Sequence, residues 1–191
     1  MIANGRGIVM VRLIVPLCFL LAISGCTSVG PSEDDKGKRT FGTRLDDGRS
    51  ARLIKRNLKA AMPEVKDMNI DVHVYNGIAL LTGQANVEAI KTKAGDIAAQ
   101  PRHVTKVYNE IDIAGPTALL SRTNDGVLKT KIKTRMMASR SVASGRIKVV
   151  VENGVVFLLG LVTRDEARSA VEEVRAVYGV QKIVQAFEFI N

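Results

Sequence analysis

A run of basic side chains between residues 122 and 148 offers the clearest chemistry in this sequence. In this stretch eight Lys and Arg residues stand against Asp125 alone, a net charge of +7 in a 191-residue chain whose formal net charge is +9. Clustered cations attract anionic partners, which include nucleic acid, membrane surfaces and acidic polymers. The eight residues are Arg122, Lys129, Lys131, Lys133, Arg135, Arg140, Arg146 and Lys148.

Residue patterns typical of catalysis or metal binding are absent from the sequence. His73 alternates outward on a predicted strand and His103 follows Pro101 in a predicted turn, so both are interpreted as surface histidines and no metal site is expected. The acidic pairs Asp46-Asp47, Asp165-Glu166 and Glu172-Glu173 are interpreted as helix caps or solvated groups. No HExxH, GxSxG or GK[ST] motif occurs. We therefore predict no enzyme activity, no cofactor and no small-molecule substrate.

The N-terminal segment has the composition of a secretory signal. Arg6 and Arg12 precede an uninterrupted apolar run of 11 residues, 13–23, which is followed by small residues. Because crossing a bilayer takes about 20 apolar residues, this run is too short for a transmembrane helix and is typical of a signal peptide. We assign residues 1–25 to the signal, with either Met1 or Met10 as the start.

The residues Ile23-Ser24-Gly25-Cys26 resemble a bacterial lipobox. The resemblance implies that Cys26 is acylated and becomes the mature N-terminus; an ordinary signal peptide with a chance Cys is the alternative. Thr27 resembles the sorting residue of outer membrane lipoproteins. We therefore expect a lipid-anchored protein at the periplasmic face of the outer membrane. Export excludes nucleic acid as the partner, and three Tyr and five Phe residues offer little base-stacking surface.

The remainder of the chain is a tandem duplication. The apolar residues Ile70, Val72 and Val74, with the following Asn-Gly, recur 77 residues later. The residues upstream recur at an offset of 78 and those downstream at an offset of 76. Each copy predicts a helix after Gly48 or Gly126, a hairpin turning at Asn-Gly, a second helix and a last strand. The fold class is α+β, with the order αββαβ and two helices covering one face of a three-stranded sheet.

The first helix of the second copy must position the basic run. At about 100° per residue, Leu128, Ile132, Met136 and Ser139 share the face that the duplication predicts to be buried. Apolar side chains among flanking cations are expected of a helix that rests on an anionic bilayer, while a merely solvated basic face is the alternative. The candidate lipid-binding residues are Val127, Lys129, Lys131, Lys133, Arg135, Met137 and Arg140.

The segments IDVHVYNGIALLTGQ and IKVVVENGVVFLLGLV, with VTKVYNEIDI and VQKIVQAFEFI, resemble BON domains. Together with the lipobox and a short tether, they resemble the dual BON-domain outer membrane lipoproteins of the DolP (YraP-type) family. The resemblance implies a mixed sheet in each domain. It also implies binding of anionic phospholipids (phosphatidylglycerol, cardiolipin) through the second domain, and a role in outer membrane integrity and cell division.

The predicted organisation follows from the signal, the composition and the repeat. Residues 26–45 form the lipidated N-terminus and a flexible tether, 46–114 the first BON domain, 115–123 a linker and 124–191 the second BON domain. The alternative function is an adaptor that binds envelope or division proteins through sheet edges or the near-neutral first domain. Vesicle binding by each copy alone would separate the two functions.

Overall fold

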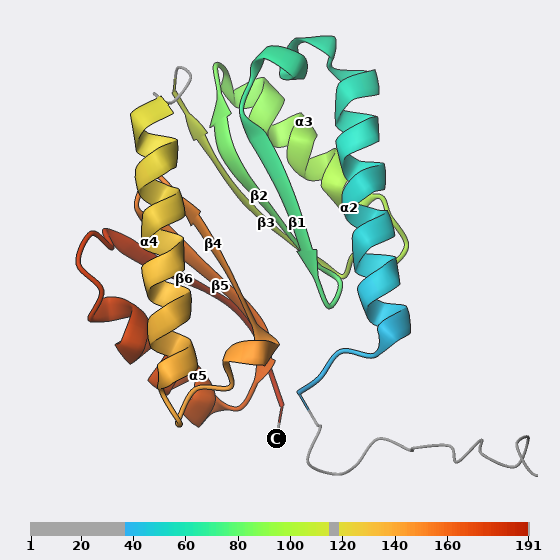
Figure 1. The fold of residues 1–191 in the computed structure, drawn as a ribbon. Helices are drawn as coiled ribbons and strands as arrows, with labels where there is room; N and C mark the ends of the chain where they lie inside the picture. Colours follow the sequence, from blue (N-terminus) through green and yellow to red (C-terminus); the bar gives the residue numbers. More distant parts are fainter. Residues whose placement is uncertain (1–36, 115–118, 191) are drawn as a thin grey trace, which may run out of the picture. The chain divides into compact units, whose positions relative to one another are not determined.

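One secondary-structure order occurs twice along the chain (Figure 1). The computed structural model describes residues 37–114 and 119–190. The first copy contains α2 (Phe41–Ala61), η3 (Pro63–Asp67), β1 (Ile70–Tyr75), β2 (Ile78–Ala85), α3 (Glu88–Ala99) and β3 (Lys106–Ile113). The second contains α4 (Leu119–Ala138), η4 (Ser144–Arg146), β4 (Ile147–Glu152), β5 (Val155–Val162), α5 (Arg164–Arg175) and β6 (Lys182–Phe189). The predicted αββαβ order is confirmed in both copies.

Each copy folds into a three-stranded mixed sheet. In the first, β2 lies in the centre, antiparallel to β1 and parallel to β3, and β4, β5 and β6 repeat this arrangement. The hairpins turn at Asn76-Gly77 and Asn153-Gly154, with positive φ at both residues of each turn. This is the backbone conformation that a type I′ turn requires, so the predicted hairpins are confirmed.

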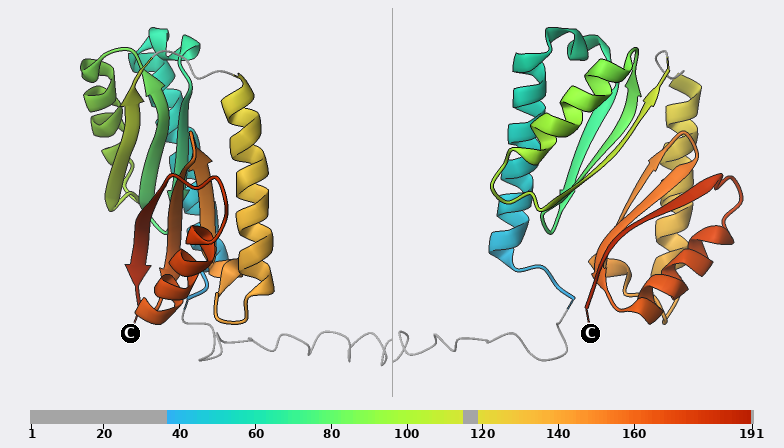
Figure 2. Two further views of the ribbon diagram at one scale, coloured as in Figure 1. Left: turned by 90° about the vertical axis from the view of Figure 1, so that its left-hand side faces the viewer. Right: turned by 180° about the vertical axis from the view of Figure 1, so that it is seen from behind.

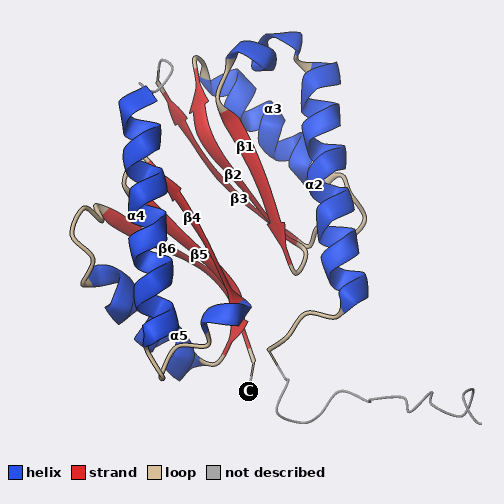
Figure 3. Cartoon of the chain, in the orientation of Figure 1, coloured by secondary structure: helices blue, strands red, loops and turns tan. Residues whose placement is uncertain are grey.

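Helices cover one face of each sheet (Figure 3), as predicted. In the first copy, Ile54 and Leu58 of α2 pack with Val72 and Val74 of β1 in one core, together with Ile90, Ala94 and Ile97 of α3. The second core contains Leu128, Ile132 and Met136 of α4, Val149 of β4, and Ala167, Val171 and Val174 of α5. The apolar spacing of the helices therefore identified their buried faces correctly.

The other faces of the two sheets pack against each other (Figures 1 and 2). We call this contact the inter-sheet layer; it buries Tyr75, Ile78 and Leu80 of the first domain and Val150, Phe157, Leu159 and Ala186 of the second. Both sheets are therefore enclosed between helices on one side and a second sheet on the other. This explains why all eight residues of β2, Ile78–Ala85, are buried.

The inter-sheet layer has an approximate two-fold symmetry that follows from the duplication. Tyr75 donates its hydroxyl to the carbonyl oxygen of Arg146, and Asn69 Nδ2 donates to Glu152 Oε1 at 3.4 Å. Tyr75 and Glu152 occupy equivalent positions, as do Asn69 and Arg146, each pair being separated by the repeat of 77 residues. Exchanging the two copies therefore converts one contact into the other, as in a symmetric dimer interface.

The first helix of each copy begins earlier than the sequence predicted. Helix α2 begins at Phe41, where the Thr40 hydroxyl accepts from the backbone N–H of Thr43 at 3.1 Å, and α4 begins at Leu119. The expectation that the helices begin after Gly48 and Gly126 is therefore wrong. Glycine within a helix costs only about 1 kcal/mol relative to alanine, which flanking turns and core contacts offset here.

The earlier starts also change the predicted boundaries. Residues 41–45 belong to α2 and not to a flexible tether, and residues 119–123 of the predicted linker belong to α4. Immediately before α2, Arg39 Nη1 pairs with Asp47 Oδ2 at 2.6 Å, and its guanidinium carbon lies 3.5 Å from the centroid of the Tyr75 ring. These contacts fix the chain from residue 39 onward.

Candidate functional site

Helix α4 carries the predicted site and is held by one apolar stripe. Leu128, Ile132 and Met136 are at most 7% exposed, whereas Val127 and Met137 are 49% and 67% exposed. The predicted separation of buried and outward residues is confirmed for these five positions. The apolar stripe packs on the second domain's core, so the remaining surface of α4 is free to display the cations.

The candidate residues form two rows on opposite flanks of α4. Val127, Lys131 and Arg135 follow the flank beside α5, where Arg135 Nε pairs with Glu173 Oε2 at 2.7 Å. Lys129, Lys133 and Met137 follow the other flank, and the last two line a hollow with Ser144 and Gly145. Arg140 is exposed just beyond the end of the helix. The structure therefore brings the candidates together as two rows and not as one continuous patch.

The row containing Lys129 adjoins the domain interface, where His73 lies. Burial, and then the charge of Lys148, lower the pKa of His73 to about 4; Lys129 and Lys55 act in the same direction and Asp71 opposes them. Burial followed by the charge of Arg39 lowers the pKa of Lys148 as well. His73 is therefore half-buried and not a fully exposed surface histidine, because its outward strand face lies near Lys148 and Lys129 of the second domain.

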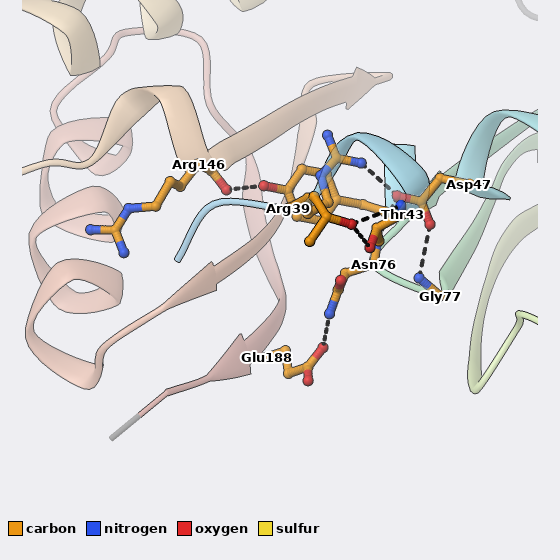
Figure 4. Close-up of polar contacts among 9 residues, drawn as sticks. Arg39, Thr43, Asp47, Asn76, Gly77, Arg146 and Glu188 are labelled. Atoms are coloured by element: carbon orange, nitrogen blue, oxygen red, sulfur yellow. Dashed lines mark hydrogen bonds and ion pairs between the residues drawn. The ribbon is translucent and has the colours of Figure 1, made fainter. Parts of the chain in front are cut away.

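Asp47 and Asp125 make matched contacts that sequence analysis missed. Asp47 Oδ1 accepts from the N–H of Gly77 at 3.0 Å and Oδ2 from the N–H of Asn76 at 2.9 Å (Figure 4). Asp125 makes the same pair of contacts to the second hairpin, at 2.9 and 2.7 Å. Each carboxylate lies inside a helix and braces the hairpin turn of its own domain.

The other acidic pairs have roles closer to those expected. Thr163 and Glu166 form a capping box at the start of α5, with Glu166 N donating to Thr163 Oγ1 at 3.2 Å and Thr163 N donating to Glu166 Oε2 at 2.9 Å. Glu173 pairs with Arg135 of α4. Capping therefore accounts for Glu166 but not for Asp47. The signal that could have identified Asp47 is the joint recurrence of Asp-Gly and Asn-Gly in both copies.

A second exposed group near α4 was not predicted from the sequence. Tyr178, in the loop between α5 and β6, is 95% exposed and lines a hollow of about 440 Å³ with Val127 and Lys131. The loop brings this aromatic side chain to the same flank of α4 as the first row of candidates. Sequence periodicity could not identify it, because a loop residue has no repeating pattern.

The described residues contain neither a metal cluster nor a membrane-crossing helix. Across 37–114 and 119–190 no three His, Cys, Asp or Glu side chains gather in a way that could hold a metal ion. Over the same ranges no helix combines the length and apolar character that a membrane crossing requires. The predicted signal peptide and the lipidation site Cys26 lie outside the described residues.

Comparison with known proteins identifies both repeats. The BON domain model matches residues 46–115 and 124–191. Two relatives align over 153 residues, 80% of this chain and 79% of each relative: the 21 kDa hemolysin of Actinobacillus pleuropneumoniae at 32% identity and the outer membrane lipoprotein DolP of Haemophilus influenzae at 29%. One similar solved structure is the C-terminal domain of CdsD, a structural protein of the type III secretion system of Chlamydia trachomatis. The alignment covers 76% of this chain and 67% of the CdsD chain, at 14% identity and a TM-score of 0.31.

Proposed function

The chain belongs to the BON domain family, and we propose that it is a non-enzymatic outer membrane lipoprotein whose second domain binds anionic phospholipid. In this proposal Cys26 carries the lipid anchor and the two domains face the periplasm. The head groups are phosphatidylglycerol and cardiolipin, and binding supports outer membrane integrity and cell division. The lipobox resemblance and the relative named as an outer membrane lipoprotein support this location at the outer membrane.

The observation that carries this proposal is the charge and exposure of α4. Its cations Lys131, Lys133 and Arg135 are exposed, as are the apolar side chains of Val127 and Met137. Basic residues near an anionic membrane contribute roughly 1 kcal/mol each. Stable anchoring already follows from two or more acyl chains, so these residues select head groups and orient the domain on the surface.

Vesicle sedimentation of the mature chain lacking only its lipid tests the proposal. We expect binding to vesicles of equimolar phosphatidylglycerol and phosphatidylcholine, little binding to phosphatidylcholine alone, and weakening with added salt. Changing Lys129, Lys131, Lys133 and Arg135 to Glu should lower the affinity about 1,000-fold, at roughly 1 kcal/mol per lost cation.

The first domain offers a matched control for this variant. Four exposed cations on α2, namely Arg49, Arg52, Arg56 and Lys59, can be changed to Glu with the same loss of net charge. We expect this control to retain most of the vesicle affinity. Equal losses in both variants would mean that net charge, and not α4, determines binding. Binding that ignores salt, or that survives the α4 changes, would contradict the proposal.

A protein adaptor is the second candidate, and one observation favours it. Phe41 and Leu45, one turn apart at the start of α2, are 77% and 42% exposed. A pair of exposed apolar side chains on a helix is typical of a surface that contacts another protein. An adaptor of this kind would bind no vesicles, whereas changing Phe41 and Leu45 to Ser would abolish its association with an envelope partner.

A further inference from the structure

Tyr178 has an exposure that packing within the domain does not explain. Its side chain is 95% exposed, the largest value among the big apolar side chains of the described residues. The hollow of about 440 Å³ beside it lies between the middle of α4, the hairpin turn at Asn153-Gly154 and residues 178–181. Val127 and Lys131 of α4 line the same hollow. An aromatic ring, a β-branched side chain and an ammonium group therefore border one depression of the surface.

The loop that carries Tyr178 is held in place by backbone contacts. Val177 N donates to the carbonyl of Val174 at 3.0 Å, and Val180 N donates to that of Val177 at 3.4 Å. Gly179 has a φ of +101° and lies against Leu128, so that a Cβ there would be 3.7 Å from Leu128 Cδ1. The backbone of the turn that carries Tyr178 is thus held by these hydrogen bonds and lies against Leu128 of α4.

The first domain contains a corresponding loop with different side chains. Val104 N donates to the carbonyl of Pro101 at 2.9 Å, which is the counterpart of the contact between Val180 and Val177. By the offsets of the repeat, the position of Tyr178 is occupied by Arg102 and that of Val127 by Arg49. One backbone contact is therefore shared, but Gly179 has a positive φ that its counterpart His103 lacks, and the two apolar side chains occur only in the second domain.

We propose that Tyr178 and Val127 together enter the interfacial region of a phospholipid bilayer while Lys131 contacts its anionic head groups. Tyrosine suits this position because its ring is apolar and its hydroxyl can remain hydrogen-bonded at the head-group level. Lysine can place its ammonium among phosphates while its aliphatic stem follows the apolar contact. This inference rests on the proposed function and adds to it an insertion point made by two separate elements, α4 and the loop before β6.

Single tryptophans can report the depth of each position, because the chain contains no Trp. The variants are Tyr178→Trp, Val127→Trp and, as the matched control in the first domain, Arg102→Trp, each made in the mature chain lacking only its lipid. Vesicles of equimolar phosphatidylglycerol and phosphatidylcholine, with the phosphatidylcholine brominated on its acyl chains, are added to each. We expect quenching and a blue shift of the emission at positions 178 and 127, and neither at position 102.

A second variant separates insertion from charge. Tyr178→Ser should weaken vesicle binding about tenfold, because it removes the aromatic ring that becomes buried in the bilayer. It should leave the slope of affinity against salt concentration unchanged. Lys131→Gln should instead reduce that slope, because it removes a charge that salt screens. Since Tyr178 is almost fully exposed, its replacement is expected to leave the thermal unfolding curve unchanged.

The outcomes distinguish this inference from the proposed function. If the Tyr178→Trp variant binds but its emission stays unquenched, while that of the Val127→Trp variant is quenched, Tyr178 lies outside the bilayer. The inference is then wrong, although phospholipid binding stands. If Tyr178→Ser binds as tightly as the unchanged chain, the inference also fails. If no variant binds phosphatidylglycerol vesicles at any salt concentration, the proposed function fails and the insertion point fails with it.

Discussion

Replacing Asp125 with Asn should destabilise the second domain by an amount that its two contacts define. The carboxylate accepts from the backbone N–H groups of Asn153 and Gly154 at 2.7 and 2.9 Å. Hydrogen bonds to a charged group contribute about 1.5 to 3 kcal/mol each. Asparagine keeps one acceptor oxygen but turns its NH₂ group toward the other N–H. The expected loss is therefore about 2 to 4 kcal/mol in the free energy of unfolding.

Urea unfolding followed by circular dichroism measures this loss on the mature chain lacking its lipid. Hydrogen exchange at the amides of Asn153 and Gly154 supplies a local reading, because these two donors lose their acceptor and should exchange faster. Asp47→Asn offers a parallel case in the first domain. Its loss should be at least as large, since Asp47 also pairs with Arg39.

Asp165→Asn is the matched control for the removal of a carboxylate. Among residues 37–114 and 119–190, Asp165 pairs with Arg168 alone, at 3.1 Å on the surface, and its side chain is 87% exposed. Exposed pairs of this kind contribute at most about 1 kcal/mol. If Asp125→Asn changed stability no more than this control, or if exchange at Asn153 and Gly154 were unaltered, the brace between helix and hairpin would be refuted.

Two further predictions concern the domain interface and the glycines. Because the folded chain holds the pKa of His73 at about 4, below the ordinary 6.5 of the unfolded chain, the unfolded state binds a proton first as the pH falls. This group should therefore lower the stability by about 2 kcal/mol between roughly pH 7.5 and pH 5. The urea midpoint of the His73→Gln variant should not show this loss of stability as the pH falls. A midpoint that depends on pH as strongly as that of the unchanged chain would contradict the prediction. Gly126→Ala should stabilise α4 by up to about 1 kcal/mol, because nothing lies within 4 Å of the added Cβ. Gly83→Ala should instead destabilise the first domain by about 3 kcal/mol or more, since Gly83 has a φ of +110° and the Cβ would overlap the carbonyl of Asn69; equal thermal midpoints for the two alanine variants would disprove this account.

Local patterns were sufficient to predict the elements of each domain. The hairpin turns follow from Asn-Gly between alternating apolar residues, and the buried face of α4 follows from Leu128, Ile132 and Met136. The packing of the two sheets did not follow, because the continuous apolar run in β2 indicates burial on both sides without identifying what covers the second side. Only the folded chain places Leu80 opposite residues of the second domain.

The start of α2 and the environment of His73 were mispredicted for different reasons. Glycine and acidic residues at positions 47 and 48 resemble a helix start, but the contacts of Thr40 and Arg39 extend the helix toward the N-terminus. His73 belongs to a strand face that would be solvated in one domain by itself. The environment of His73 thus depends on residues distant in the sequence, whereas the start of α2 depends on Thr40 and Arg39, which lie just outside the pattern at positions 47 and 48.

The approximate two-fold symmetry of the inter-sheet layer has a consequence for how the two copies can diverge. In a dimer of identical chains, one residue type must suit both sides of the axis. Joining the copies in one chain removes this requirement, so a tyrosine can fill position 75 while a glutamate fills the equivalent position 152. The same freedom allows one domain to keep Arg49 and Arg102 where the other carries Val127 and Tyr178. Duplication thus permits the two halves to specialise while they remain each other's structural support.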